Sequence, residues 1–355
     1  MSFSLLQRNQ IFPCVGRKNT RTFKVTTCIA ALFSSAIVPS YSFQISPASL
    51  TTILSQTSLF RSSLLLNYHS PLLSTKYNSK RFRVYKMSSE STNHFSQRKL
   101  EVIQAPCLDD NYGYLIHDPA TGETAAVDTP DAEVYQKELE KRGWKLTHIF
   151  NTHHHWDHTG GNLKLKKNGV KIYGPVQEKD RIPGIDVPVG NGDTIDFGSS
   201  KTVVLDVGGH TNGHIAYHFP EEKCVFTGDA LFSLGCGRMF EGTPSQFWNS
   251  LKKLRSLSDE TTVYCAHEYT MSNANFAISV EPGNKDLVAK IEEIKDKRAR
   301  NEATIPVNLG EEKKTNPFLR IDVSEQIRKN VGTLDTDDDS DVFAKVRKAK
   351  DNFRG

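Results

Sequence analysis

The chain has 355 residues, 37% of them hydrophobic and 24% charged, with 23 Gly and 15 Pro, which excludes collagen-like, coiled-coil and low-complexity proteins. The formal net charge of +4 hides two unlike parts: residues 1–89 contain 11 Lys and Arg but no acid, whereas residues 90–355 contain 34 basic and 41 acidic residues, a net charge of −7. The acidic body argues against a protein that binds a nucleic-acid backbone.

Residues 1–89 form a leader with the composition of an organelle transit peptide, because they are rich in Ser (17 residues) and free of acids. We expect it to be disordered and to direct the protein to an organelle, the mitochondrion ahead of the plastid. The nearly apolar run 28–38 is shorter than the roughly 20 residues of a membrane span. It has the length of a signal-peptide core, so a secretory or two-part plastid signal remains an alternative, as does an extension without an address. Translation from Met87 would leave the protein in the cytosol.

Neither a disulfide framework nor a zinc ribbon is indicated by the six cysteines. Cys14 and Cys28 lie in the leader, and the other four show no CxxC pair: Cys107, Cys224, Cys236 and Cys265. A reducing compartment fits this pattern best.

Short β-type runs, each bounded by Gly, Pro, Asp or Asn, follow the leader. We predict strands at 100–104, 112–117, 123–127, 147–151, 171–173, 202–207, 215–219, 224–227 and 262–265. An amphipathic segment, 132–142, predicts a helix that ends at Gly143. A second helix is predicted over 244–257, because Thr243 can cap it and Pro244 suits its first turn.

Beyond residue 267 the chain becomes more charged. Residues 286–301 carry Leu287, Ile291 and Ile294 in helical register, and the basic segment 341–353 is also predicted to be helical. The Asp-rich stretch 333–341 is predicted to be a surface loop. These patterns divide the body into a β-rich domain, 98–267, and a mostly helical domain, 268–355.

The strongest functional signal is THHHWDH at 152–158, directly after an apolar run. Side chains at i and i+2 of an extended segment point to the same side, so His153 and His155 can bind one metal ion together. Asp157 and His158, on the turn that follows, can face a neighbouring ion.

One such cluster supplies too few ligands for two ions. Further candidates stand beside turn residues at predicted strand ends, namely His210, Asp229 and His267. Imidazole and carboxylate groups suit zinc, iron or manganese, and a carboxylate such as Asp229 can bridge two ions that acidify a shared water. A loosely binding histidine-rich loop is the alternative, but it would explain neither Asp157 nor the downstream candidates.

The remaining histidines are assigned no ligand role. His154 is one position out of step with its neighbours and should point away from the ion. His214 either supports the site or takes no part in it. Packing or surface positions are expected for His117, His148 and His218.

With its HxHxDH motif, the chain resembles the metallo-β-lactamase superfamily and, within it, the glyoxalase II (hydroxyacylglutathione hydrolase) family. The resemblance covers about residues 100–353. It rests on PCLDDNY at 106–112, FTGD at 226–229, GCGR at 235–238, EGT at 241–243, HEYT at 267–270, EPGN at 281–284 and NPFLR at 316–320. HxHxDH alone indicates the superfamily, whereas HEYT, NPFLR and the helical extension indicate the family. The implied fold is of the α/β (α+β) class, an αββα sandwich of two sheets followed by a mostly helical domain.

The resemblance implies two divalent metal ions, zinc in the first place, with iron or manganese as alternatives. The implied ligands are His153, His155 and His210 for the first ion, Asp157, His158 and His267 for the second, and Asp229 as the bridge. The implied reaction is hydrolysis of S-(2-hydroxyacyl)glutathione thioesters, such as S-lactoylglutathione, by a hydroxide shared by the ions, the second step of methylglyoxal detoxification. Asp157 and Asp229 are the implied catalytic carboxylates. Because a thiol has a pKa of about 8.5, the departing glutathione needs no strong general acid.

The residues implied to bind glutathione are Arg238, Phe240, Tyr269, Arg347 and Lys350. The family usually has Lys at the position of Arg238 and often Tyr at that of Phe240, so affinity and substrate range are in question. Without the resemblance, residues 347–350 would be read as a solvated helix face. A chain that ends before Asp341 is expected to keep its metals but to bind substrate poorly.

A different function on the same fold is glutathione persulfide dioxygenase, which uses a single iron. We expect that enzyme to lack HEYT and the helical extension. A ribonuclease-type phosphodiesterase is disfavoured by the acidic body, and a lactonase would not need the basic C-terminal helix. We expect a monomer whose partner is a small glutathione thioester, and neither nucleic acid nor membrane.

Overall fold

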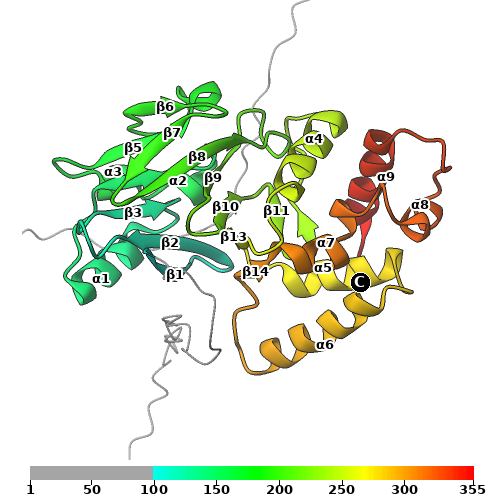
Figure 1. The fold of residues 1–355 in the computed structure, drawn as a ribbon. Helices are drawn as coiled ribbons and strands as arrows, with labels where there is room; N and C mark the ends of the chain where they lie inside the picture. Colours follow the sequence, from blue (N-terminus) through cyan, green and yellow to red (C-terminus); the bar gives the residue numbers. More distant parts are fainter. Residues whose placement is uncertain (1–98) are drawn as a thin grey trace, which may run out of the picture. The chain divides into compact units, whose positions relative to one another are not determined.

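The computed structural model describes residues 99–355, and the predicted leader, with Cys14 and Cys28, lies outside the described residues (Figure 1). The four cysteines of the described part are buried, and none of them forms a disulfide with another. Across residues 99–355, no helix combines the length and the apolar character needed to cross a membrane.

The first sheet of the described chain has six strands in sequence order. They are β1 (Glu101–Cys107), β2 (Asn111–His117), β3 (Thr124–Val127), β4 (His148–Phe150), β5 (Lys171–Pro175) and β6 (Val187–Val189). Strands β1 to β3 pair antiparallel, and β3 to β6 pair parallel. Five of these strands were predicted. Strand β6 was missed because it has only three residues and Pro188 at its centre.

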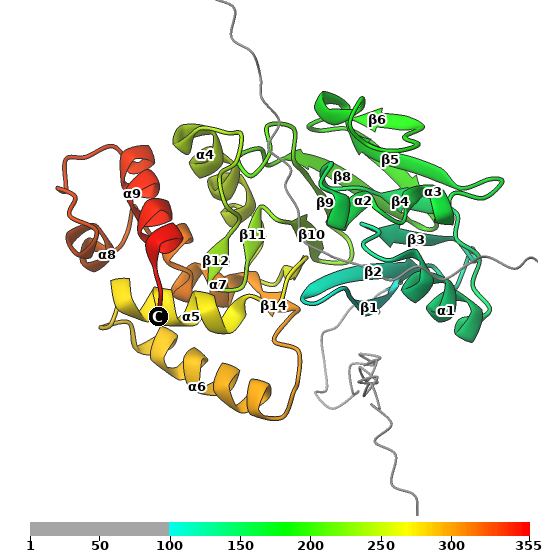
Figure 2. The ribbon, with the colours of Figure 1, turned by 180° about the vertical axis from the view of Figure 1, so that it is seen from behind.

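The second sheet also has six strands, in the order β14-β13-β10-β9-β8-β7. They are β7 (Thr194–Phe197), β8 (Ser200–Asp206), β9 (Ile215–Phe219), β10 (Cys224–Gly228), β13 (Thr262–Cys265) and β14 (Val307–Asn308). Only β10 and β13 pair parallel among these neighbours. A small hairpin, β11 (Leu231–Phe232) and β12 (Gly235–Cys236), follows β10 and lies beside α5 (Thr270–Val280) (Figure 2).

Buried apolar side chains lie between the two sheets and on the outer face of each sheet, where helices cover them. The inner faces of the sheets share one apolar cluster that includes Phe150 and Tyr217. The outer face of the first sheet packs on α1 (Ala132–Arg142) through Tyr135 and Leu139. The outer face of the second sheet packs on α4 (Pro244–Arg255). This arrangement confirms the predicted αββα sandwich.

The two best-signalled helices begin and end near their predicted residues because their caps are local. Asp131 caps α1, which ends at Gly143 in the left-handed conformation with φ 69°. Thr243 accepts a hydrogen bond from the Gln246 amide at the start of α4. One apolar face of α4 is buried, through Phe247, Trp248, Leu251 and Leu254.

The mostly helical C-terminal part was also predicted, although several of its elements were not. Its helices are α5, α6 (Lys285–Ala299), α7 (Leu309–Thr315), the 3-10 turn η2 (Pro317–Leu319), α8 (Glu325–Asn330) and α9 (Asp339–Asn352). The prediction of a loop over 333–341 was wrong for its last residues, because Asp338 caps α9 and the acidic residues that follow form the first turn of this helix. Carboxylates are favoured there by the unpaired amides and the helix dipole.

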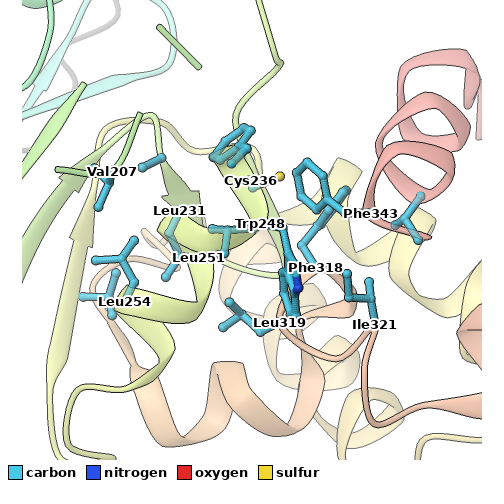
Figure 3. Packing of buried hydrophobic residues seen from close by; sticks show 14 of the residues in the cluster. Val207, Leu231, Cys236, Trp248, Leu251, Leu254, Phe318, Leu319, Ile321 and Phe343 are labelled. Carbon is cyan, nitrogen blue, oxygen red and sulfur yellow. The ribbon is translucent and has the colours of Figure 1, made fainter. Parts of the chain in front are cut away.

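The last helix belongs to the core of the molecule. Val342, Phe343 and Val346 on α9 are fully buried, in the same cluster as Phe247 of α4 and Phe318 of η2 (Figure 3). A chain that ends before Asp341 would lose all three of these α9 side chains. The expectation that such a truncation merely weakens substrate binding is therefore replaced by an expectation that it unfolds.

A buried carboxylate on α7 supports the small hairpin. Glu312 accepts hydrogen bonds from the Leu234 amide at 2.8 Å, from Asn316 Nδ2 at 3.0 Å and from Ser233 Oγ at 3.2 Å. Burial raises the pKa of its carboxyl from 4.5 to about 7. The folded protein therefore retains a proton on Glu312 at pH values where the unfolded chain has lost it.

This difference predicts a pH-dependent contribution to stability. The stabilisation by protonated Glu312 is lost as the pH rises from the unfolded pKa of 4.5 through about 7. Relative to Glu312→Gln, the free energy of unfolding of the wild type should fall by about 2–3 kcal/mol between about pH 5 and pH 8. Urea unfolding of both proteins in the presence of a chelator measures this difference, and parallel pH profiles would contradict it.

Candidate metal centre

All seven predicted metal ligands lie together where strands β4, β8, β10 and β13 lead into their following segments. Three overlapping sets of residues each have ligand atoms within 4.8 Å of one another. These sets are His153, His155 and His210; His153, His158 and Asp229; and Asp157, His158 and His267. The first set is called the first ligand group below, and the last set the second ligand group.

Three imidazole nitrogens converge in the first ligand group. His155 Nδ1 lies 3.0 Å from His153 Nε2 and 3.1 Å from His210 Nε2. His153 and His155 therefore point to the same side, as the alternation in the sequence predicted. His210 reaches them from the segment that follows β8.

The second ligand group contains the carboxylate of Asp157. Asp157 Oδ2 lies 3.6 Å from His158 Nε2 and 3.5 Å from His267 Nε2. Asp157 and His158 stand on the short helix α2 (Trp156–Thr159), where a turn was expected. His267 lies two residues after the end of β13, so the two sheets supply the group jointly.

Asp229 stands between the two groups and presents one carboxylate oxygen to each. Its Oδ1 lies 3.4 Å from both His158 Nε2 and His267 Nε2, and its Oδ2 lies 3.5 Å from His210 Nε2. Gly228 brings Asp229 to this point with φ 49°, and a Cβ on Gly228 would lie 2.4 Å from Thr152 Oγ1. A side chain at position 228 would therefore push β10 away from the histidine segment.

The positions of the donor atoms suit metal coordination better than hydrogen bonding among the side chains. The single nitrogen His155 Nδ1 can carry at most one proton, yet two other imidazole nitrogens lie within 3.1 Å of it. Nitrogens bound at about 2.0–2.1 Å to a tetrahedral zinc lie about 3.3 Å apart, close to this spacing. His158 Nε2 and Asp229 Oδ1 are buried without a hydrogen-bond partner. The nitrogen and oxygen donors suit zinc, iron or manganese.

The charge states of the ligands also favour a cation. Burial, and then the neighbouring histidines, lower the pKa of His153 well below its usual value and that of His155 to about 4. Both rings are therefore neutral near pH 7, which is the form that binds a metal. At His158, burial opposes protonation, but Asp229 and Asp128 outweigh it and raise the pKa well above its usual value. The surrounding carboxylates thus favour positive charge beside His158.

Three of the ligand rings are oriented by a contact at Nδ1, which leaves Nε2 facing the centre. Each contact is 2.8 Å long: His158 to Asp128 Oδ2, His267 to Asp110 Oδ1, and His210 to the carbonyl oxygen of Arg238. The sequence interpretation missed Asp128 and Asp110 as supporting residues. Asp110 stands in the family-like stretch 106–112 and could have been found there, whereas no local pattern marks Asp128.

The other histidines near the centre have different contacts. His154 turns away from the ligand groups, and its Nδ1 lies 2.7 Å from Glu178 Oε2. His214 Nε2 accepts a hydrogen bond from the Asp229 amide at 3.1 Å. Of the two open interpretations of His214, the structure therefore favours support of the site. His117 stacks on Trp144, outside the centre.

Two of the predicted glutathione contacts lie against the ligand rings, one beside each group. Phe240 is exposed and packs on His155 and His210, with ring centroids 5.8 and 5.2 Å apart. Tyr269 stacks on His267 at 4.7 Å. Burial, and then Asp110 and Asp229, raise the pKa of Tyr269, so its hydroxyl stays a neutral donor.

The three predicted cations are placed differently from one another. Arg238 is exposed. Arg347 is buried, and it donates from Nη1 to the carbonyl oxygens of Cys236 and Gly237 and from Nη2 to Asp351. It therefore supports the backbone that precedes Arg238, and its direct contact with glutathione stays a prediction. Lys350 is half-buried and donates to Ser272 Oγ at 3.0 Å.

Two family models match the chain, and the boundary between them lies at the start of the helical C-terminal part. The family model of the metallo-beta-lactamase superfamily matches residues 111–267, and that of the hydroxyacylglutathione hydrolase C-terminus matches residues 268–353. The hydroxyacylglutathione hydrolase of Erythrobacter litoralis (strain HTCC2594) is 53% identical over 255 residues, which are 72% of this chain and 100% of that protein. The protein of the same name from Maricaulis maris (strain MCS10) is 50% identical over 72% of this chain and 99% of its own length. Among solved structures, ETHE1 from Myxococcus xanthus is 27% identical, with a TM-score of 0.48, over 70% of this chain and 97% of that one.

Proposed function

The chain belongs to the hydroxyacylglutathione hydrolase family, and we propose that it hydrolyses S-(2-hydroxyacyl)glutathione thioesters at the seven-residue centre. The observation that carries this proposal is the placement of Asp229, with one oxygen facing each ligand group. The match of residues 268–353 to the C-terminal model of this family supports a glutathione thioester as the substrate. The products would be glutathione and a 2-hydroxy acid such as lactate.

We propose that the centre holds two divalent cations, zinc in the first place. When bound, two such cations would lower the pKa of a water and polarise the thioester carbonyl between them. The residues of the chain hold the donors in place: Asp128 and Asp110 orient His158 and His267, and the amide of Asp229 is held by His214. A thiol has a pKa of only about 8.5, so glutathione can leave as the thiolate and the site needs no residue to protonate the departing sulfur.

The deciding experiment is turnover of S-lactoylglutathione by the protein begun at Met87, with the metal content measured on the same sample. We expect hydrolysis with two metal equivalents per chain. A protein that contains one iron, consumes oxygen with glutathione persulfide and leaves the thioester intact would instead support the dioxygenase alternative. Zinc, iron and manganese are compared by reconstituting the metal-free protein with each.

The binding role of Lys350 predicts a pH-dependent KM. Burial, followed by the charge of Arg347, lowers the pKa of Lys350 to about 8. Its ammonium is therefore lost as the pH rises through about 8, and with it the attraction for a glutathione carboxylate. We expect the wild-type KM to rise between about pH 7 and pH 9, whereas Lys350→Arg, which stays charged, should show a flatter profile.

Lys350→Ala tests the same contact at constant pH. We expect its KM near pH 7 to be about 5–10-fold above that of the wild type, with both metals retained, because a partly exposed charged hydrogen bond is lost. Added salt should weaken binding by the wild type more than by the variant. An unchanged KM would return Lys350 to the role of a surface residue.

For the cellular location, we propose an organelle, the mitochondrion ahead of the plastid. The support is the acid-free, Ser-rich composition of residues 1–89. Residues 1–86 fused to a fluorescent reporter should carry it into an organelle, whereas the protein begun at Met87 should stay in the cytosol. Diffuse fluorescence from the full leader fusion would refute the targeting proposal and leave the enzymatic proposal intact.

We also propose that the protein acts as a monomer and binds no nucleic acid. The net charge of −7 over residues 90–355 supports the second statement, because a phosphate backbone would be repelled. Light scattering on the eluted protein, over a range of concentrations, tests the first.

A further inference from the structure

One buried carboxylate outside the ligand set joins the two segments that build the first ligand group. Glu178 ends the 3-10 turn η1 (Val176–Glu178), which follows β5, and only 2% of its surface is exposed. Its Oε2 accepts a hydrogen bond from the His154 amide at 2.8 Å and lies 2.7 Å from His154 Nδ1. Its Oε1 accepts from Thr211 Oγ1 and from the Gly213 amide, the latter at 3.0 Å.

These partners are the sequence neighbours of the first-group ligands. His154 lies between His153 and His155, and Thr211 follows His210. The two segments are more than fifty residues apart in the chain, and each belongs to a different sheet connection. Glu178 therefore joins the segment that carries His153 and His155 to the segment that carries His210.

The backbone of the His210 segment packs closely against the Glu178 side chain. A Cβ on Gly213 would lie 2.7 Å from Glu178 Cγ and 2.8 Å from Gln177 Cβ. The backbone of the His210 segment thus passes against η1 only because residue 213 has no side chain. Removal of the carboxylate would leave several buried donors without an acceptor, which the segments could relieve only by moving apart.

The rings of the second ligand group are oriented by other carboxylates. Asp128 and Asp110 hold His158 and His267, and neither bonds to Glu178. A change at Glu178 should therefore act on one group much more than on the other.

We propose that Glu178 is a positioning residue that sets the metal affinity of the first ligand group by holding its two segments together. The inference deepens the proposed function, because it rests on a metal pair at this centre. It assigns Glu178 no contact with substrate or with the reacting atoms.

The test compares Glu178→Ala, Glu178→Gln and a matched control, Glu222→Ala, with the wild type. Glu222 is equally buried and accepts hydrogen bonds from the Lys99 amide and Ser200 Oγ. It precedes β10, whereas Asp229 follows that strand, so the control removes a buried carboxylate at the far end of the same element.

Chelator competition measures the two zinc affinities of each protein, and mass spectrometry of the dialysed samples measures zinc content. In Glu178→Ala we expect the dissociation constant of one zinc to rise about 10–100-fold and that of the other to change little. Cobalt absorption spectra should lose the component of a site made of three imidazoles. Glu222→Ala should bind both zinc ions as the wild type does.

Glu178→Gln provides the graded comparison and remains informative if the Ala variant fails to fold. Its amide oxygen can accept from the His154 amide, and its NH2 can donate to the Thr211 hydroxyl, but the Gly213 amide loses its acceptor. We expect a smaller rise in the same dissociation constant, about 3–10-fold. At saturating zinc, kcat should recover in both variants with KM unchanged, because the carboxylate does not touch substrate.

The outcomes separate this inference from the proposed function. Two wild-type zinc affinities in the Glu178 variants, or equal weakening of both sites, would overturn the positioning role. Selective weakening supports that role whatever the substrate proves to be. Failure of the wild type to hydrolyse S-lactoylglutathione, with two metals bound, would overturn the proposed function alone.

Discussion

Replacing Asp229 with Ala should remove one of two metal equivalents and lower thioester hydrolysis to near background. The carboxylate is buried and offers Oδ1 to His158 and His267 and Oδ2 to His210. Without it, two neighbouring cations would repel each other with no shared anion between them, and the cation that remains could not act in concert with a second. We expect a fall in kcat of at least about 1,000-fold.

Asp229→Asn is the matched variant, because it keeps the shape of the side chain but only one oxygen. It should retain activity between that of Asp229→Ala and the wild type, with the metal content of the two variants measured alongside the rate. Retention of two metals and a normal rate in Asp229→Ala would show that Asp229 does not bridge. Thermal unfolding of both variants would exclude a general loss of structure.

Replacing Phe343 with Ala should lower the free energy of unfolding by about 3–5 kcal/mol, although the residue lies far along the chain from any ligand. Phe343 is fully buried, and its ring lies 5.4 Å from Phe247 and 6.1 Å from Phe318, measured between centroids. The cavity left by Ala would lie between α9, α4 and η2, in the cluster where Figure 3 shows Phe343 near Phe318. A chain that ends before Asp341 should not fold at all.

Denaturant unfolding measures the effect, with Lys348→Ala as the control on the same helix. Lys348 is exposed, so its removal should change the free energy of unfolding by less than about 0.5 kcal/mol. A small effect of Phe343→Ala, or a truncated chain that folds and binds two metals, would show that the fold does not require α9. The role of this helix in binding glutathione is therefore better tested through Lys350 than by truncation.

Several features of this protein followed from the sequence alone because their causes are local. Helix α1 begins after the capping carboxylate of Asp131 and ends at Gly143, so both signals lie next to the helix in the sequence. His153 and His155 point to the same side because the extended chain alternates, and no distant contact is needed for that. The αββα fold and the ligand assignment came from the resemblance carried by HxHxDH, HEYT and NPFLR.

Helix α5 shows where local signals fail. Its sequence, TMSNANFAISV, mixes small polar residues with apolar ones, and its buried face includes Thr270 and Asn273 as well as Phe276, so the spacing of apolar residues does not mark it clearly. Similarly, the Asp-rich stretch before residue 341 has the composition of a loop, but its last residues start a helix whose apolar face packs on α4.

The supporting contacts of the centre were decided only by the tertiary structure. Asp128 and His158 are 30 residues apart, and Asp110 and His267 are 157 residues apart. Glu178 joins two segments of different sheets, and Arg347 reaches the backbone of Gly237 across 110 residues. Which carboxylate or guanidinium completes such a contact depends on how the two sheets and the last helix pack, and no spacing along the chain records that packing.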